Sequence, residues 1–406
     1  MPPATSRQAT EAAQTPSASS RTAGKALARP FLGMIDPVLV DDPADYPFPG
    51  SIGRKQAQAI WIWVARDLCG DIIDMDRVER SVMDVSEIEP LMPQIMTRMR
   101  EAVAEAGSKI EAARRIRTQL GGDEAYERLP VMLNALRCRA LLIKAQGFGK
   151  AANTIPDEAA LGVALQSMPL QDPQVAALLL HAAVGQVVNP SRLVAAVVRL
   201  VGNGDEAAIV RSGFGPLIDA LLAHAQSNIC ALQPIGPFAD IDLICRSLDR
   251  FHKLIRAVTG YVSVQRGSRW GTVLGALTKR ISERIEPRLR DVVPNINQSL
   301  RKGREGADRL DTDQLLAALN GIYLLGTIRD CRDSLALNAV FEQAWNQSGE
   351  ALEMHIGRNL DALRLNPDDK LTGTRLDFGI KMAEIRFNPE YAETLKRART
   401  AAERRS

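Results

Sequence analysis

Residues 172–202 read DPQVAALLLHAAVGQVVNPSRLVAAVVRLVG and decide the fold class. Asp172-Pro173 and Asn189-Pro190 each place a capping side chain directly before a proline, which is the strongest helix-start signal in the chain. The apolar residues that follow are too short a run to span a bilayer, because spanning needs about 18 residues. The stretch therefore predicts two buried helices, at about 172–187 and 189–202, joined by a tight turn.

The composition of the whole chain agrees with a helical fold. Hydrophobic residues make up 46% of the 406 residues and charged residues 24%, values typical of a globular protein, but aromatic residues make up only 4%. Val, Ile and Thr do not gather into alternating runs, so the sequence offers little from which to build a sheet. We expect an all-α protein with a disordered N-terminal tail, a helical-hairpin region and a C-terminal helical bundle.

A short segment after residue 202 resembles a known repeat. Residues 206–222 read EAAIVRSGFGPLIDALL, in which a short helix ends at glycine and proline opens a longer helix. This segment resembles the central part of an armadillo repeat. The matching positions are Ile209, Val210, Gly213, Pro216, Leu221 and Leu222, whereas Gly215 and Asp219 stand where the repeat usually has apolar residues. The resemblance implies an armadillo- or HEAT-like stack of helical hairpins.

The chain divides by composition into three parts. Residues 1–50 are rich in Pro, Ser, Thr and Ala, and we expect disorder to about Asp45, followed by an irregular strap at 46–53 that docks on the fold. Residues 51–231 form the helical-hairpin region. Prolines and a glycine at 232–238 mark a boundary, and residues 239–406 form the C-terminal bundle. The tail is also compatible with a targeting or export signal.

Glycine and proline predict where helices stop. Gly121-Gly122 predicts a break, Pro130 a kink or restart, and residues 147–150, which read GFGK, a loop. Pro287 and Pro294 predict an end to the helix that begins near Trp270, because proline removes a backbone hydrogen bond from a helix interior.

Charge is distributed unevenly along the chain. Net charge is +3 overall, yet residues 253–304 carry twelve lysines and arginines against three acids, a local charge of +9. This basic segment is the strongest functional lead in the sequence, because such a face binds an acidic protein, nucleic acid or an anionic lipid surface, or else pairs with the chain's own acids. The candidate partner-binding residues are Arg266, Arg269, Lys279, Arg280, Arg284, Arg288 and Arg290.

The sequence contains no clustered catalytic or metal-binding motif. The four histidines lie far apart, and a satisfied, half-buried histidine is the simplest interpretation of His181. The five cysteines form no CxxC pattern, which predicts free thiols in a reducing compartment, although a Cys–His nucleophilic pair stays open because its members need not be neighbours in sequence. We expect no metal and no cofactor.

These observations favour a non-enzymatic helical scaffold or adaptor that binds another protein in the cytoplasm. An excess of arginine over lysine together with abundant alanine suggests a bacterial genome. Two alternatives remain open. One is a secreted bacterial effector that uses the N-terminal tail as its export signal and acts in a host cell. The other is a nucleic-acid or anionic-membrane binder that uses the basic segment.

Overall fold

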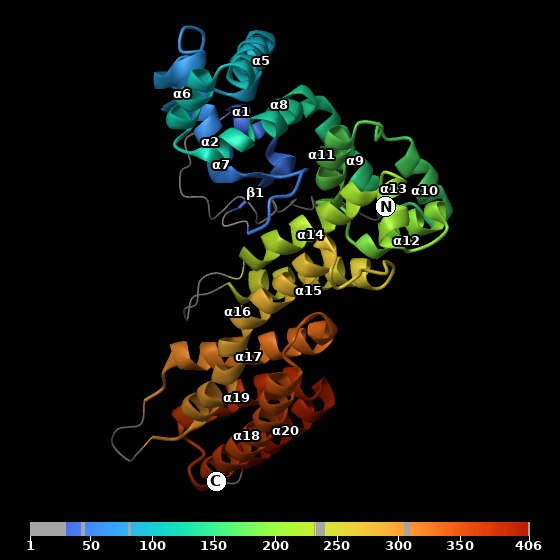
Figure 1. The fold of residues 1–406 in the computed structure, drawn as a ribbon. Coiled ribbons are helices and arrows are strands. Elements are labelled where there is room, and N and C mark those ends of the chain that lie inside the picture. The colour runs from blue at the N-terminus through green and yellow to red at the C-terminus, as the bar shows by residue number, and fades with distance from the viewer. Residues whose placement is uncertain are drawn as a thin grey trace, which may run out of the picture.

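The computed structural model shows an all-α protein, which confirms the predicted fold class (Figure 1). It describes residues 30–41, 45–79, 83–230, 232, 240–303 and 309–404. In these residues the only strands are β1 (Leu39–Val40) and β2 (Ile52–Gly53), which pair in parallel with Leu39 opposite Ile52. None of the helices described is long and apolar enough to cross a membrane.

Short helices make up most of the N-terminal part. They are α1 (Pro30–Gly33), the 3₁₀ turn η2 (Asp36–Val38), α2 (Arg54–Trp63), the π-helical turn η3 (Val64–Leu68), α3 (Met75–Glu79), α4 (Val85–Ile88), the 3₁₀ turn η4 (Glu89–Leu91), α5 (Met92–Ser108), α6 (Ile110–Leu120), α7 (Asp123–Glu127) and α8 (Leu129–Arg137). The break at Gly121-Gly122 and the restart near Pro130 are confirmed, because α6 ends at a left-handed Gly121 and α8 begins at Leu129.

Longer helices make up the middle and C-terminal parts. The middle helices are α9 (Arg139–Ala151), α10 (Glu158–Gln166), α11 (Pro173–Val184), α12 (Pro190–Val201), α13 (Glu206–Arg211), α14 (Gly215–Cys230), α15 (Ile241–Thr259) and α16 (Arg269–Leu300). The C-terminal helices are α17 (Thr312–Cys331), the 3₁₀ turn η5 (Arg332–Ser334), α18 (Asn338–Leu365), α19 (Lys370–Arg386) and α20 (Pro389–Glu403). In Figure 1, α14, α15 and α16 lie between the N-terminal helices and the α17–α20 layer.

The two helices predicted from residues 172–202 form as expected. The Asp172 carboxylate accepts hydrogen bonds from the backbone N–H groups of Gln174 and Val175, and the Asn189 side chain accepts one from Ser191. Each cap satisfies backbone groups that a helix start leaves without a partner, and the proline that follows has a preset backbone angle. α11 is buried over most of its length and α12 over half of its length.

From α9 onward the helices pack in two rows. One row is formed by α9, α11, α14, α16 and α18, each of which contacts the next, and the other by α10, α12, α15, α17 and α19. The rows touch each other through the pairs α14–α15, α16–α17 and α18–α19. The rows are continuous through α14–α16, so α15 packs on α12 and α14 across the predicted boundary at 232–238. The predicted division there stays a prediction.

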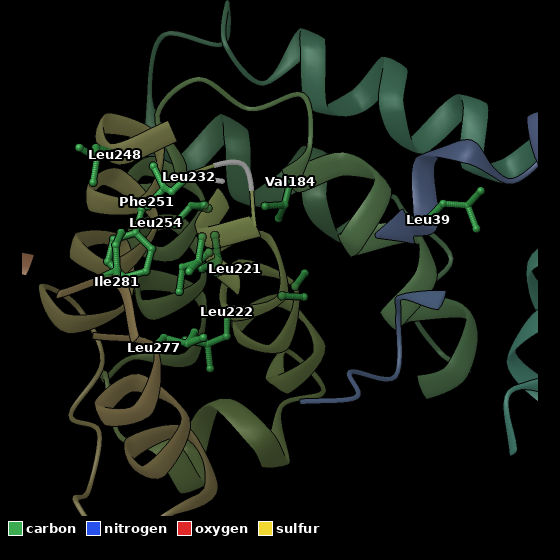
Figure 2. Close-up of a cluster of buried hydrophobic side chains, with 14 of the residues drawn as sticks. Leu39, Val184, Leu221, Leu222, Leu232, Leu248, Phe251, Leu254, Leu277 and Ile281 are labelled. Carbon is green, nitrogen blue, oxygen red and sulfur yellow. The ribbon is translucent and has the colours of Figure 1, made fainter. Parts of the chain in front are cut away.

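A single hydrophobic core runs through both rows. Figure 2 shows its centre, where side chains of three helices point toward one another. They are Leu221 and Leu222 of α14, Leu248, Phe251 and Leu254 of α15, and Leu277 and Ile281 of α16. This apolar centre fixes the positions of α14 and α16, which carry the candidate site described below.

Three expectations from the sequence are wrong. The disorder expected to about Asp45 does not extend over residues 30–41, which fold as α1, η2 and β1, because Phe31, Ile35 and Val38 are fully buried in the core. Residues 1–29 lie outside the described part of the chain, so the disorder expected there stays a prediction.

The other two errors concern helix length. Residues 147–150 are helical, because a Cβ at position 149 would clash with the Ala183 carbonyl oxygen and glycine therefore lets α9 pack closely on α11. Pro287 and Pro294 lie inside α16, which continues to Leu300. Each proline costs the helix a backbone hydrogen bond, but the buried face of α16, which packs against α17 and α18, keeps it helical.

Candidate partner-binding surface

The candidate residues of the basic segment do not form one basic face. Arg280, Arg284 and Arg288 lie at four-residue spacing on α16 and are half-buried. Arg284 Nη1 lies 3.4 Å from the Ile229 carbonyl oxygen, and Arg288 Nη2 donates to the Leu232 carbonyl oxygen at 2.7 Å. Since the C-terminal end of a helix carries partial negative charge, these two arginines stabilise the end of α14.

The remaining candidates differ in exposure and in partners. Arg266, Lys279 and Arg290 are exposed, with Lys279 3.8 Å from Glu283 and Arg290 paired with Glu286 one turn earlier. Exposed pairs of this kind contribute about 0–1 kcal/mol. A role for these residues in partner binding stays a prediction.

Arg269 contacts Phe48 of the segment predicted to dock at 46–53, and Arg280 contacts Asp45, just before that segment. The structure confirms that this part of the chain docks on the fold, and residues 45–50 are called the strap below. Residues 45–50 leave the N-terminal part and lie against α11, α14 and α16. The side chains alternate: residues 45, 47 and 49 are exposed, whereas Phe48 and Gly50 are buried. Such alternation is typical of an extended segment that lies along a surface.

The backbone of the strap is held by side chains. The Tyr46 N–H donates to Gln226 Oε1 at 2.9 Å, and Gln226 Nε2 donates to the Tyr46 carbonyl oxygen at 3.1 Å. Gln226 is only 4% exposed, although it is polar. Arg128 Nη1 lies 3.4 Å from the Phe48 carbonyl oxygen. These contacts do not depend on which side chains the extended segment carries.

Two side chains and one glycine anchor the strap. The Asp45 carboxylate pairs with Arg280 of α16. The ring of Phe48 is 1% exposed, and the Arg269 guanidinium lies over it at 5.7 Å from the ring centroid. A Cβ at Gly50 would clash with the Ala177 carbonyl oxygen of α11, so only glycine permits this approach.

Asp219 of α14 positions Arg269. Its Oδ1 accepts hydrogen bonds from Arg269 Nη1 at 2.7 Å and from Trp270 Nε1 at 2.9 Å. Asp219 is 9% exposed, and these charge-assisted bonds satisfy a carboxylate that is costly to bury without partners. The signal that pointed to it was its departure from the armadillo pattern at an otherwise apolar position.

A pair of histidines lies beside the strap, where α11 meets α14. The rings of His181 and His224 stack with centroids 4.2 Å apart and planes 21° apart, and His224 Nε2 donates to the His181 carbonyl oxygen at 2.9 Å. Burial, followed by the charge of Arg250, lowers the pKa of His224 to about 4, and burial lowers the pKa of His181 as well. His181 is 1% exposed, more buried than the sequence suggested. Both rings are therefore neutral at pH 7.

Three of the five thiols have raised pKa values and so show no sign of activation. Burial raises the pKa of Cys331 to about 12, and burial also raises the pKa of Cys69 and of Cys245. A nucleophilic cysteine needs a lowered pKa, so these three thiols stay protonated at neutral pH. Among the described residues no three His, Cys, Asp or Glu side chains gather closely enough to hold a metal ion.

No protein-family model, no curated protein and no solved structure matches this chain.

Proposed function

We propose that the protein is a non-enzymatic helical scaffold that binds an extended segment of another protein across α11, α14 and α16. The observation that carries this proposal is the pairing of Gln226 with both backbone groups of Tyr46. A side chain that satisfies the main chain of an extended segment accepts many sequences, whereas a buried aromatic ring adds selectivity. The same surface supplies both features.

The two-row packing supports the proposal. Neighbouring packed helices lie about 8–10 Å apart, and an extended chain advances about 3.3 Å per residue, so roughly three residues of a bound segment pass each helix. In the strap, Asp45 contacts α16, Tyr46 contacts α14 and Gly50 approaches α11. The segment 206–222, which resembles an armadillo repeat, supplies the first part of α14, and that resemblance stays a prediction.

The strap itself indicates the chemistry of the partner segment. Its sequence from residue 45 is DYPFPG, in which an acid precedes an aromatic residue by three positions. Arg280 takes the acid, and the buried position beside Arg269 takes the aromatic ring. A partner segment with this spacing competes with the strap for the surface.

Selection from a library of displayed peptides tests the proposal. The bait is the full chain with Asp45→Ala and Phe48→Ala, in which both side-chain anchors of the strap are removed. We expect enrichment of peptides that carry an acid three residues before an aromatic residue, and much weaker enrichment when Gln226→Ala is added. Absence of enrichment, or the same enriched peptides with and without Gln226, contradicts the proposal.

A further inference from the structure

A hollow of about 980 Å³ lies at the C-terminal end of α16, beside α18. Its lining includes Arg301 and Lys302, directly after α16, together with Arg309 and with Arg358 of α18. None of the described residues that line it carries a carboxylate. The C-terminal end of the basic segment therefore supplies Arg301 and Lys302 to a concave site. The middle of the segment lies against the strap and the end of α14.

Three of these cations have no counter-charge among the described residues. The guanidinium groups of Arg301, Arg309 and Arg358 form no ion pair or hydrogen bond with any described residue. Some arginines of the C-terminal helices are paired, Arg364 with Asp361 and Arg399 with Asp377. Lys302 is also paired, with its Nζ 2.8 Å from Asp369 Oδ2.

The guanidinium groups of Arg358 and Arg301 lie close enough to His355 to affect its pKa. Its ring is 5% exposed, and its Nε2 lies 2.9 Å from Asn297 Oδ1. Burial lowers the pKa of His355, and the charges of Arg358 and Arg301 lower it further. The imidazole is therefore neutral at pH 7 and lies within the field of both arginines.

We propose that this hollow binds a small molecule that carries a phosphate group. Arginine offers a planar fork of donors that matches phosphate oxygens, and three exposed arginines that line one hollow offer an anion several such forks. The volume is that of a small-molecule site, which spans about 300–1,000 Å³. The basic segment was expected to bind an acidic protein, nucleic acid or lipid. For the C-terminal end of that segment, we propose a phosphorylated small molecule.

Calorimetric titration of the full chain with inorganic pyrophosphate at low salt tests the site. The test variant combines Arg301→Gln with Arg358→Gln, and the control variant combines Arg199→Gln with Arg211→Gln, two exposed arginines of α12 and α13 that have no described partner. We expect saturable binding to the unmodified chain and to the control, weakened at least tenfold in the test variant. Arg358→Lys, which keeps the charge but loses the fork, should weaken binding by less.

Other results overturn the proposal. They are the absence of pyrophosphate binding, equal binding by the test variant and the unmodified chain, or loss of binding in the control as large as in the test variant. A single-stranded DNA of 20 nucleotides serves as the last ligand in the test. If it binds through Arg301 and Arg358 and pyrophosphate does not compete with it, the surface binds a nucleic acid and the small-molecule proposal is wrong.

Discussion

Gln226 pairs with the main chain of Tyr46 through both halves of its amide, although the two residues are 180 positions apart in the sequence. The pairing ties the extended strap to α14 in the middle of the helical array. Because it uses only backbone groups of the strap, it represents the least sequence-dependent contact on this surface. The proposed role as a scaffold for extended segments depends on this pairing of Gln226 with Tyr46.

Replacement of Gln226 by alanine should destabilise the protein by about 1–3 kcal/mol, because a half-buried N–H and C=O of the strap lose their partners. Urea unfolding measures the change, and amide hydrogen exchange at Tyr46 should speed up. Gln347→Ala, an exposed glutamine on α18, serves as the control and should change stability by less than about 0.5 kcal/mol. Unchanged exchange at Tyr46 in the Gln226 variant contradicts the pairing.

Arg250 of α15 should tolerate no conservative replacement. Its two terminal nitrogens donate to the Val187 and Val184 carbonyl oxygens, at 2.5 and 2.7 Å, and so satisfy the C-terminal end of α11. Lysine has a single ammonium group and cannot reproduce this fork, so Arg250→Lys should lower the free energy of unfolding by about 1–3 kcal/mol. Arg246→Lys, on the exposed side of the same helix, is the matched control. Equal losses of unfolding free energy for Arg250→Lys and Arg246→Lys would show that the Arg250 guanidinium fork does not contribute to stability.

The stacked histidines should make stability depend on pH. The pKa of His224 falls from about 6.5 in the unfolded chain to about 4 in the folded protein, so between these values the unfolded chain binds a proton that the folded protein does not. The stabilising contribution is complete above about pH 6.5 and is lost as the pH falls toward 4. Between pH 7.5 and 5.5, His224 alone should account for a loss of about 1 kcal/mol.

His224→Gln isolates this effect. Glutamine can donate the same hydrogen bond to the His181 carbonyl oxygen but does not titrate, while the other three histidines remain. Urea unfolding at several pH values should therefore give a shallower loss of stability in the variant. A variant that loses as much stability as the unmodified chain over this range would show that His224 is not held neutral by the fold.

Local signals in the sequence predicted much of the fold. Asp172-Pro173 and Asn189-Pro190 marked helix starts because capping and proline geometry act within a few residues. The helix end predicted from Pro287 and Pro294 was wrong, because α16 stays helical through its contacts with α17 and α18. No local sequence pattern reveals those contacts. The burial of Phe31 was missed for the same reason, because it too depends on contacts between segments that no local pattern reveals.

The candidate site was predicted only in part. The strap was expected from Tyr46, Pro47, Phe48 and Pro49, and two of the seven candidate basic residues, Arg269 and Arg280, do contact it. Gln226 and the His181–His224 stack gave no signal, because each depends on which helices become neighbours. The hollow near Arg358 joins residues from the end of α16 and the middle of α18, which only the fold brings together.

Binding of a peptide with the sequence of residues 45–51, which includes the strap, tests the central claim most directly. Phe48→Ala should open the cavity under Arg269 at a cost of about 3–5 kcal/mol, so circular dichroism must first show that this variant is folded. Fluorescence anisotropy of the labelled peptide should then show binding to the Phe48→Ala protein at least tenfold tighter than to the unmodified chain. Adding Gln226→Ala, or replacing the peptide's phenylalanine by alanine, should weaken it. Failure of the peptide to bind the folded Phe48→Ala protein, or equal binding to all three proteins, would contradict the account.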